Sequence, residues 1–314
     1  MEKFFWKKKG RVFVPDGSVE WMKTHAQGPS PIEWDGVIRT YFASRPTNDI
    51  TLPGFIDLEI ENPNNILYVH EKPILELGSP GTFDEHGIIP HPAINVNGQV
   101  YMYYIAWQRR TTVPYCLTIG LAISDDGMNF RKYSEGPILS VERFDHLTVT
   151  APCIINHNGL FYMYYTAGLK WIMLNNRWEH TYTIRMATSK DGIKWDRDFK
   201  NILEPKDEYE CISCPTVLLI DGVFHMWFSY KGSMSFRTGG DGYRIGYAVS
   251  HDLVNWERQD EKAGITVSEN KDDWDHHMIE YGAAIEVNDR RLLFYNGNGF
   301  SQSGFGYAEL VIEK

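Results

Sequence analysis

The chain has 314 residues, of which 43% are hydrophobic and 23% charged, so it can bury a large core and is not intrinsically disordered. Its 31 Lys and Arg are outnumbered by 41 Asp and Glu, and this formal charge of −10 argues against a nucleic acid partner. No stretch approaches the length of apolar sequence that a membrane span needs, so none is predicted.

The N-terminal segment MEKFFWKKKGRVF has only a short apolar patch before its lysines, which is less than the apolar core of a secretory signal. The four cysteines are too few for a disulfide scaffold, and the CxxC pair of Cys211 and Cys214 lies inside a predicted strand. We therefore expect a cytoplasmic protein with buried free thiols.

One phrase recurs along the chain: a turn with Gly, an aromatic strand, an alternating strand, and then Ser-x-Asp followed by an aromatic residue. It is plain in residues 97–133, 158–198 and 221–259, and weaker copies flank these in residues 34–75 and 288–313. The turns recur about every 60 residues, at Gly36, Gly98, Gly159, Gly222 and Asp289. Short antiparallel strands in tandem with this period predict a propeller.

We expect an all-β fold in which residues 1–314 form a single five-bladed β-propeller domain with four-stranded antiparallel blades. The last unit stops after its third strand, GYAELVIE. The N-terminal FFWKKKGRVF shares the aromatic-then-basic pattern of the outer strands NFRKY and NWERQ. The N-terminal strand is therefore predicted to complete the last blade and to close the ring, which leaves few open edges.

These repeats, such as GTFDEHGIIPHPAI and SKDGIKWDR, resemble the five-bladed propeller superfamily of glycoside hydrolases, which includes families 43, 32 and 130. The resemblance extends over residues 11–314. It implies that a sugar binds in a funnel at one end of the central channel. Members of family 43 also carry three carboxylates on their inner strands, which serve as base, pKa modulator and acid.

The family 43 triad is not found at its usual places in this sequence. Gly28 stands at the position of the base, Ala151 at that of the modulator, and Ser213 at that of the acid. The chemistry has either moved to other inner-strand carboxylates or been lost.

Acidic residues beside the predicted inner strands supply the catalytic candidates. Where they repeat from blade to blade, they are expected to cap turns, as at Asp84 and Glu85, Asp145, Asp207 and Glu208, and Asp275. Glu280 is not repeated and occupies the place of the acid in Glu-x-Pro, so it is the first catalytic candidate; an ion pair with an arginine is its structural alternative. Because glycosidic cleavage uses an acid and a second carboxylate, Glu210, Glu85 and Asp84 are the further candidates.

Substrate binding is predicted for histidines near the inner strands and for cationic or aromatic side chains beyond the second strands. Surface solvation and core packing are the alternatives for each of them. These residues are His86, His91, His146, His277, Arg109, Trp107, Lys231, Arg237 and Trp171. No cofactor is required, although the resemblance to family 43 allows a loosely held Ca²⁺ or Na⁺ in the central channel.

The sequence thus predicts a glycan-active enzyme, first of all a glycoside hydrolase with an acid/base carboxylate pair in the funnel. The expected partner is an oligosaccharide or glycoconjugate. A non-catalytic carbohydrate-binding propeller, or a glycoside phosphorylase or transferase of polysaccharide metabolism, is the alternative. The oligomeric state is not predicted.

Overall fold

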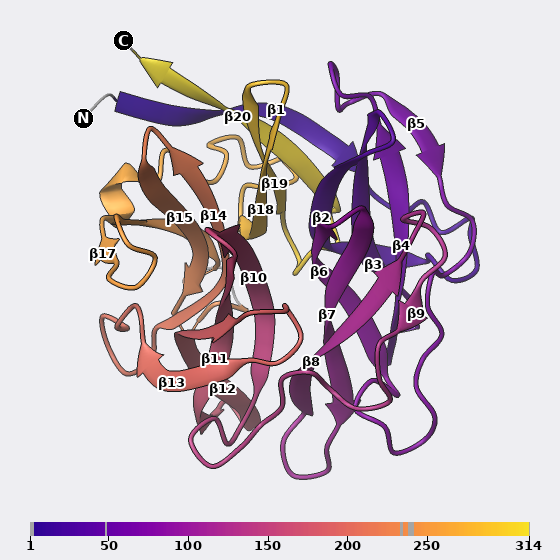
Figure 1. Ribbon diagram of the computed structural model, residues 1–314, viewed down its shortest axis with the longest axis vertical. Helices are drawn as coiled ribbons and strands as arrows, with labels where there is room; N and C mark the ends of the chain where they lie inside the picture. The colour runs from indigo at the N-terminus through magenta and orange to yellow at the C-terminus, as the bar shows by residue number, and fades with distance from the viewer. Residues whose placement is uncertain (1–2, 48, 233–234, 238–241, 314) are drawn as a thin grey trace.

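The computed structural model describes residues 3–47, 49–232, 235–237 and 242–313 (Figure 1). These residues form β-strands and one short 3-10 helix, η1 (Asp260–Lys262), and the strands pair into four-stranded antiparallel sheets. The all-β expectation is therefore confirmed. In the described part of the chain, no helix has the length and apolar character that crossing a membrane requires.

The strands follow one another as meanders, which we call sheets I to V. Sheet I contains β2 (Thr24–Trp34), β3 (Val37–Thr47), β4 (Ile50–Leu58) and β5 (Ile66–Val69). Sheet II contains β6 (Gly87–Val96), β7 (Gln99–Arg109), β8 (Tyr115–Ser124) and β9 (Arg131–Lys132). A single parallel pairing of Thr51 with Gly87 links sheets I and II.

Sheet III contains β10 (Val149–His157), β11 (Leu160–Leu174), β12 (Arg177–Ser189) and β13 (Asp196–Asn201). Sheet IV contains β14 (Cys211–Ile220), β15 (Val223–Lys231), β16 (Arg244–Ser250) and β17 (Glu257–Arg258). Sheet V contains β18 (Glu280–Val287), β19 (Arg290–Asn296), β20 (Phe305–Glu313) and, as its outer strand, β1 (Lys3–Phe13). The first and last strands of the chain thus run side by side (Figure 1).

The turn between the first two strands of each sheet explains the periodic turn signals. Its two central residues both have positive φ, as a type I′ hairpin turn requires, and Asn, Asp and Gly tolerate that conformation. The pairs are Asp35–Gly36, Asn97–Gly98, Asn158–Gly159, Asp221–Gly222 and Asn288–Asp289. A local sequence rule therefore fixes the same hairpin in every sheet.

In sheets II, III and V, the repeated aspartates link the inner part of the sheet to its outer strand. Asp84 accepts a hydrogen bond from Tyr104 Oη at 3.1 Å and pairs with Lys132 Nζ on β9 at 2.6 Å. Asp145 and Asp275 do the same with Tyr165 and Arg197 in sheet III, and with Tyr295 and Lys8 in sheet V. Lys8 lies on β1, so the N-terminal strand provides the same ion pair in sheet V that the outer strands provide in sheets II and III.

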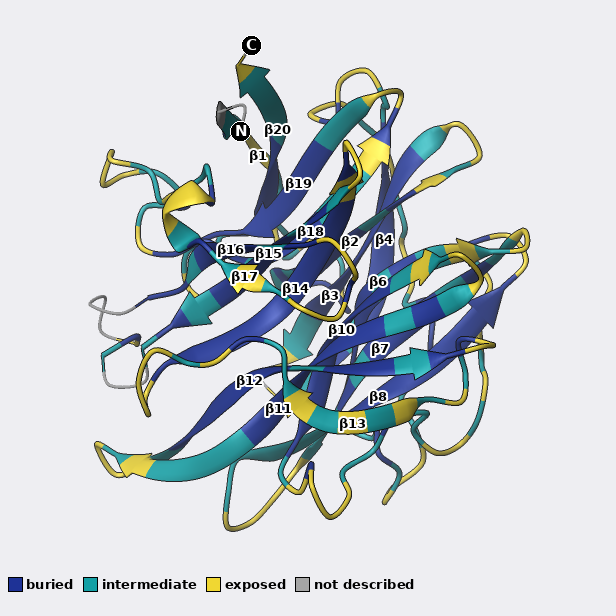
Figure 2. Ribbon diagram, turned by 60° about the vertical axis from the view of Figure 1, so that its left-hand side comes forward, coloured by how far each residue is buried: buried dark blue, intermediate teal, exposed yellow. Residues whose placement is uncertain are grey.

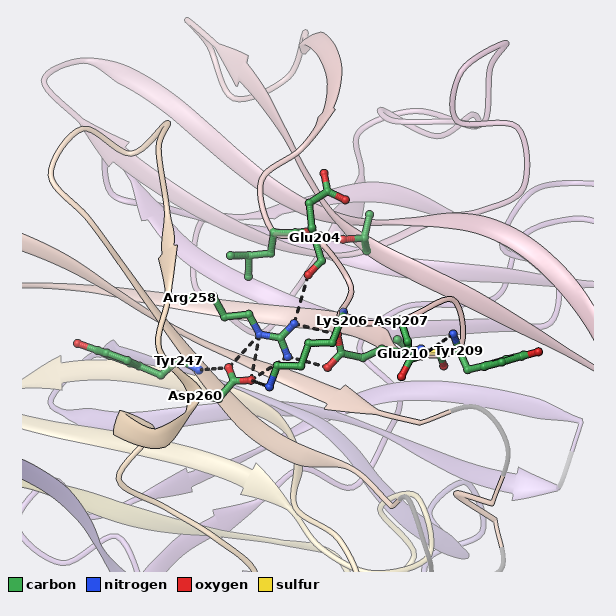
Figure 3. Close-up of polar contacts among 11 residues, drawn as sticks. Glu204, Lys206, Asp207, Tyr209, Glu210, Tyr247, Arg258 and Asp260 are labelled. Carbon is green, nitrogen blue, oxygen red and sulfur yellow. Dashed lines mark hydrogen bonds and ion pairs between the residues drawn. The ribbon is translucent and has the colours of Figure 1, made fainter.

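In sheet IV Glu210 forms the ion pair with the outer strand, while Asp207 caps a turn, as was expected of the repeated acids. Arg258 on β17 grips the Glu210 carboxylate with two hydrogen bonds of 2.7 and 2.8 Å (Figure 3). Asp207 instead accepts the backbone N–H groups of Tyr209 and Glu210 in a local turn. Glu208 extends to Lys170, at 2.7 Å.

Apolar side chains fill the space between successive sheets rather than one central core. Among the described residues, clusters of buried side chains join sheets I and II, II and III, III and IV, IV and V, and V and I. The first strands also pack against one another in turn, β2 on β6, β6 on β10, β10 on β14, β14 on β18, and β18 on β2. Burial accordingly follows the middle of the strands, and exposure the loops (Figure 2).

Candidate active site

A β-bulge interrupts the first strand of every sheet at the same level. The pairing register breaks after Gln27, Pro90, Thr150, Ser213 and Glu280. The next residue has positive φ in four of the five strands, at Gly28, Ala151, Cys214 and Tyr281. Bulges re-aim the side chains beside them and are common next to active sites. Glu280 is the acidic residue of this set.

The bulges also link each first strand to the neighbouring sheet. The freed N–H of Gly28 donates to Asn296 Oδ1 on β19, at 2.9 Å. The N–H of Tyr281 donates to Ser229 Oγ on β15, at 2.9 Å, and that of Cys214 to Thr166 Oγ1 on β11, at 3.3 Å. These bonds fix the backbone around Glu280 from the adjacent sheet.

Glu280 is a fully buried carboxyl group with 0% exposure. Neither of its oxygens has a hydrogen-bond partner among the described residues. Burial raises the pKa of this carboxyl well above its usual range, while the side chains of Tyr281 and Ser301 and the charges of Arg45 and Lys231 act in the opposite direction. A neutral carboxylic acid at the end of an inner strand is the form that donates a proton.

Arg45, on β3, does not form the ion pair that was the structural alternative for Glu280. Its Nη2 donates to Gln27 Oε1 at 3.0 Å, and its Nε is buried without a partner in the described part of the chain. The guanidinium thus leaves Glu280 unpaired but contributes positive charge near it.

Lys231 contributes a second positive charge to the same cluster. Its side chain is buried, and no carboxylate among the described residues lies within ion-pair distance. The ammonium lies 3.6 Å from the ring centroid of Phe236 and 3.5 Å from Cys211 Sγ, with Tyr182 and Tyr243 farther out. Burial lowers the pKa of Lys231. An uncompensated buried cation is suited to a ligand with negative charge or many acceptor oxygens.

Tyrosines form the wall between Lys231 and Glu280. The hydroxyls of Tyr182 and Tyr243 are hydrogen-bonded to each other, and the rings of Tyr243 and Tyr281 lie 5.8 Å apart. Burial raises the pKa of all three hydroxyls well above the usual value, so they are neutral donors.

The long hairpin of β11 and β12 brings a second carboxylate to this region. Glu179 on β12 is buried and accepts two hydrogen bonds from Arg237, at 2.6 and 3.1 Å. The adjacent His180 stacks on Trp171, with centroids 4.6 Å apart, and burial lowers the pKa of His180 to about 3. Trp171, predicted to stack on a sugar, therefore packs on a neutral imidazole.

Of the predicted site residues, the structure brings Glu280 and Lys231 into one cluster, with Arg237 and Trp171 at its border. Asp84 and Glu210 form the ion pairs that link the strands of sheets II and IV, with Lys132 and Arg258. Their catalytic roles stay predictions from the sequence.

Glu85, His86, Trp107 and Arg109 belong to another group, at the junction of sheets I and II. Glu85 accepts the N–H of Gly81 at 2.7 Å and an amide hydrogen of Gln108 at 3.1 Å. The ring centroids of His86 and Trp107 lie 5.7 Å apart, and Arg109 pairs with Asp49 at 2.9 Å. In the described residues, no contact joins this group to Glu280.

The remaining histidines have different surroundings. His91 lines a cavity of about 100 Å³ between the first strands, beside Pro152 and Pro215, and burial lowers its pKa to about 4. His146 and His277 are exposed. No group of three or more His, Cys, Asp or Glu residues in the described ranges is arranged to hold a metal ion, so the channel Ca²⁺ or Na⁺ stays a prediction.

Sequence reasoning missed Arg45, Glu179, Tyr182, Tyr243 and Tyr281. Glu179 could have been predicted from the sequence. It lies in the insertion GLKWIMLNNRWEH, which is longer than the corresponding hairpins of the other repeats. The sequence did not single out the three tyrosines as site residues, because aromatic residues are frequent in the strands of every sheet.

The amino-acid sequence is similar to those of several known proteins. No protein-family model matches it. Two uncharacterized proteins of Mycobacterium tuberculosis, MT1551 (strain CDC 1551 / Oshkosh) and Rv1502 (strain ATCC 25618 / H37Rv), are each 32% identical over 308 residues, or 97% of this chain and 99% of theirs. The 1,2-beta-oligomannan phosphorylase of Thermoanaerobacter sp. (strain X514) is 28% identical over 194 residues, or 59% of this chain and 57% of that protein.

Solved structures share the fold at low sequence identity. A glycosyl hydrolase from Bacteroides ovatus has a TM-score of 0.70 at 17% identity, over 98% of this chain and 94% of that one. A structure from the GH130 family of mannoside phosphorylases, which contains glycoside hydrolases that target beta-1,2 mannosidic linkages in Candida mannan, has a TM-score of 0.67 at 15% identity, over 98% and 94%. The chain thus shares the fold of the glycoside hydrolases and mannoside phosphorylases that its repeats resemble.

Proposed function

We propose that this chain, which belongs to the same family as the Mycobacterium tuberculosis proteins MT1551 and Rv1502, is an enzyme that cleaves a glycosidic bond. Glu280 is the proposed general acid. The observation that carries this proposal is a fully buried carboxyl group with two unpartnered oxygens, placed by a bulge among Arg45, Lys231 and buried tyrosines.

The chemistry follows from the protonation state of Glu280. Cleavage of a glycosidic bond passes through an oxocarbenium-like state, and the leaving oxygen must take up a proton. A carboxyl group that burial keeps neutral supplies that proton at neutral pH. The neutral hydroxyls of Tyr182 and Tyr243 offer donors and acceptors for sugar hydroxyls nearby.

Glu179 is the proposed second carboxylate. Arg237 donates two hydrogen bonds to it, and both Glu179 and Glu280 lie near enough to Lys231 to interact electrostatically with it. Glycoside hydrolysis uses two carboxyl groups, one as the acid and the other as base or nucleophile. We therefore propose a hydrolase that acts on an oligosaccharide or glycoconjugate.

Phosphorolysis is the second candidate, and the buried cations favour it. Lys231 has no carboxylate partner among the described residues, and the Nε of Arg45 is also unpartnered there. A phosphate ion would compensate both charges while attacking the sugar in place of water. The partial similarity to an oligomannan phosphorylase supports this candidate as well.

We further propose that sheets I to V are the blades of a single five-bladed propeller over residues 1–314, closed by β1 in sheet V. The packing of β18 on β2, and the apolar cluster between sheets V and I, support a closed ring. The site then lies at one end of the ring, where the first strands begin. A cytoplasmic location, and a Ca²⁺ or Na⁺ ion in the channel, remain predictions from the sequence.

The test compares the natural protein with Glu280→Gln on β-1,2-linked mannobiose and longer mannan oligosaccharides, with and without inorganic phosphate. Loss of general acid catalysis should lower turnover by about 10²- to 10⁴-fold while sugar binding persists. Release of a sugar 1-phosphate only with phosphate would identify a phosphorylase. Exposed Glu135→Gln is the matched control. Unchanged turnover in Glu280→Gln would exclude Glu280 as the acid, and binding without turnover in both proteins would indicate a carbohydrate-binding propeller.

A further inference from the structure

A cavity of about 730 Å³ lies outside the Glu280 cluster, where sheet IV meets the N-terminal strand of sheet V. Its walls are Trp6 and Lys8 of β1, Tyr230 at the end of β15, Arg244 at the start of β16, and the segment 260–269. This volume is within the range of small-molecule sites. The proposed catalytic role of Glu280 does not involve it.

One hydrogen-bond donor at this cavity lacks an acceptor among the described residues, and one guanidinium there has no carboxylate partner among them. Trp6 is 4% exposed, and its indole Nε1 is buried with no acceptor among the described residues. Arg244 donates from Nη1 to the carbonyl oxygens of Gly242, Tyr243 and His277, at 2.9–3.1 Å, and no described carboxylate pairs with it. Buried donors are normally satisfied, so the unsatisfied indole N–H of a residue that lines a cavity points to a missing acceptor.

Other groups on the walls supply acceptors and apolar faces. Glu261 and Glu269 are exposed carboxylates, and Trp6 and Tyr230 contribute aromatic rings. Asp260 is already neutralised by Arg258 and Lys206, at 2.8 and 2.7 Å (Figure 3). Lys8 is similarly paired with Asp275. Among the described residues, Arg244, Glu261 and Glu269 thus have no ion-pair partner, and the indole N–H of Trp6 has no acceptor.

We propose that this cavity is a second carbohydrate-binding site, which takes a neutral saccharide. A sugar presents hydroxyls that accept from the indole and guanidinium and donate to the carboxylates, and its apolar face packs on aromatic rings. An acidic sugar would be repelled by Glu261 and Glu269, and an apolar ligand would leave the donors unsatisfied. Binding here holds the enzyme on a longer glycan and is independent of cleavage.

The test follows the indole N–H signals of the 10 tryptophans by two-dimensional ¹H–¹⁵N NMR, in full-length Glu280→Gln protein. The conservative change Trp6→Phe identifies the Trp6 signal. Titration with β-1,2-mannobiose and with cellobiose should shift that signal, whereas digalacturonate should not. Thr266→Trp fills the cavity from an exposed wall position and should weaken the effect roughly tenfold or more.

Lys190→Trp places the same side chain at an exposed position in a turn of sheet III and should leave the titration unchanged. Arg244→Met removes the cation and should also weaken binding. The proposal is refuted if the Trp6 signal stays fixed with both neutral disaccharides, if Thr266→Trp changes nothing, or if digalacturonate binds better than the neutral sugars. Each of those results leaves the assignment of Glu280 intact, because turnover is measured separately.

Discussion

Replacing Glu280 by Gln should make the protein progressively more stable than the natural one as the pH rises. Burial raises the pKa of this carboxyl in the folded state, whereas in the unfolded chain it is close to about 4.3. Between these two values the folded state holds a proton that the unfolded state has lost. The favourable contribution is thus fully present below the unfolded pKa and disappears as the pH rises through the folded one.

The magnitude follows from the proton linkage alone. Within that window, each pH unit changes the free energy of unfolding by about 1.4 kcal/mol. Glutamine has no such proton, so the difference between Glu280→Gln and the natural protein should grow by up to about 4 kcal/mol from pH 5 to pH 8, as long as the carboxyl stays protonated.

Urea unfolding of both proteins at pH 5, 6, 7 and 8 measures this difference, and other titrating groups cancel because the two chains share them. Glu135→Gln, at an exposed carboxylate, should give a difference that does not vary with pH. A flat difference for Glu280→Gln as well would mean that Glu280 is ionised in the folded protein. The neutral acid required for proton donation would then not exist.

Two further substitutions test the ion pairs that tie the sheets. Asp145→Asn leaves two guanidinium groups facing an uncharged amide and should cost about 3–5 kcal/mol of unfolding free energy in urea, whereas Asp125→Asn at an exposed pair should cost less than about 1 kcal/mol. Glu210→Gln should cost about 3 kcal/mol in the same assay yet leave turnover per folded molecule unchanged, because its carboxylate serves Arg258. A large loss of turnover without loss of stability would instead support the catalytic role of Glu210.

The hairpins were predictable because a local rule governs them, whereas the ion pairs of the repeated acids join residues far apart in sequence. The Asn–Gly and Asp–Gly pairs encode a turn that needs no distant partner. An aromatic residue followed by an acid marks the tie of each sheet at Phe83–Asp84, Phe144–Asp145 and Trp274–Asp275. The same pattern occurs at Tyr209–Glu210, where Glu replaces Asp, and that change concealed its structural role.

The candidate site was predictable only in part, because its members come from different sheets. Glu280 departs from the repeat, and that departure alone marks it as a candidate in the amino-acid sequence. Arg45 and Tyr243 lie far from it in sequence and come near it only through the packing of the sheets around one another, and Glu179 comes near Lys231 in the same way. Such long-range proximity has no local signature, since each of these residue types is common in strands.

The pairing of β1 with β20 has a consequence for how the protein is made. Phe4 faces Ile312 across this pair, so β1 leaves the ribosome long before its neighbour β20 has been synthesised. Phe4 and Trp6 also pack on Trp227, so β1 stays uncovered until β15 at least has followed. Contacts of such long sequence separation form slowly. The N-terminal strand is therefore where we expect chaperones to engage the nascent polypeptide.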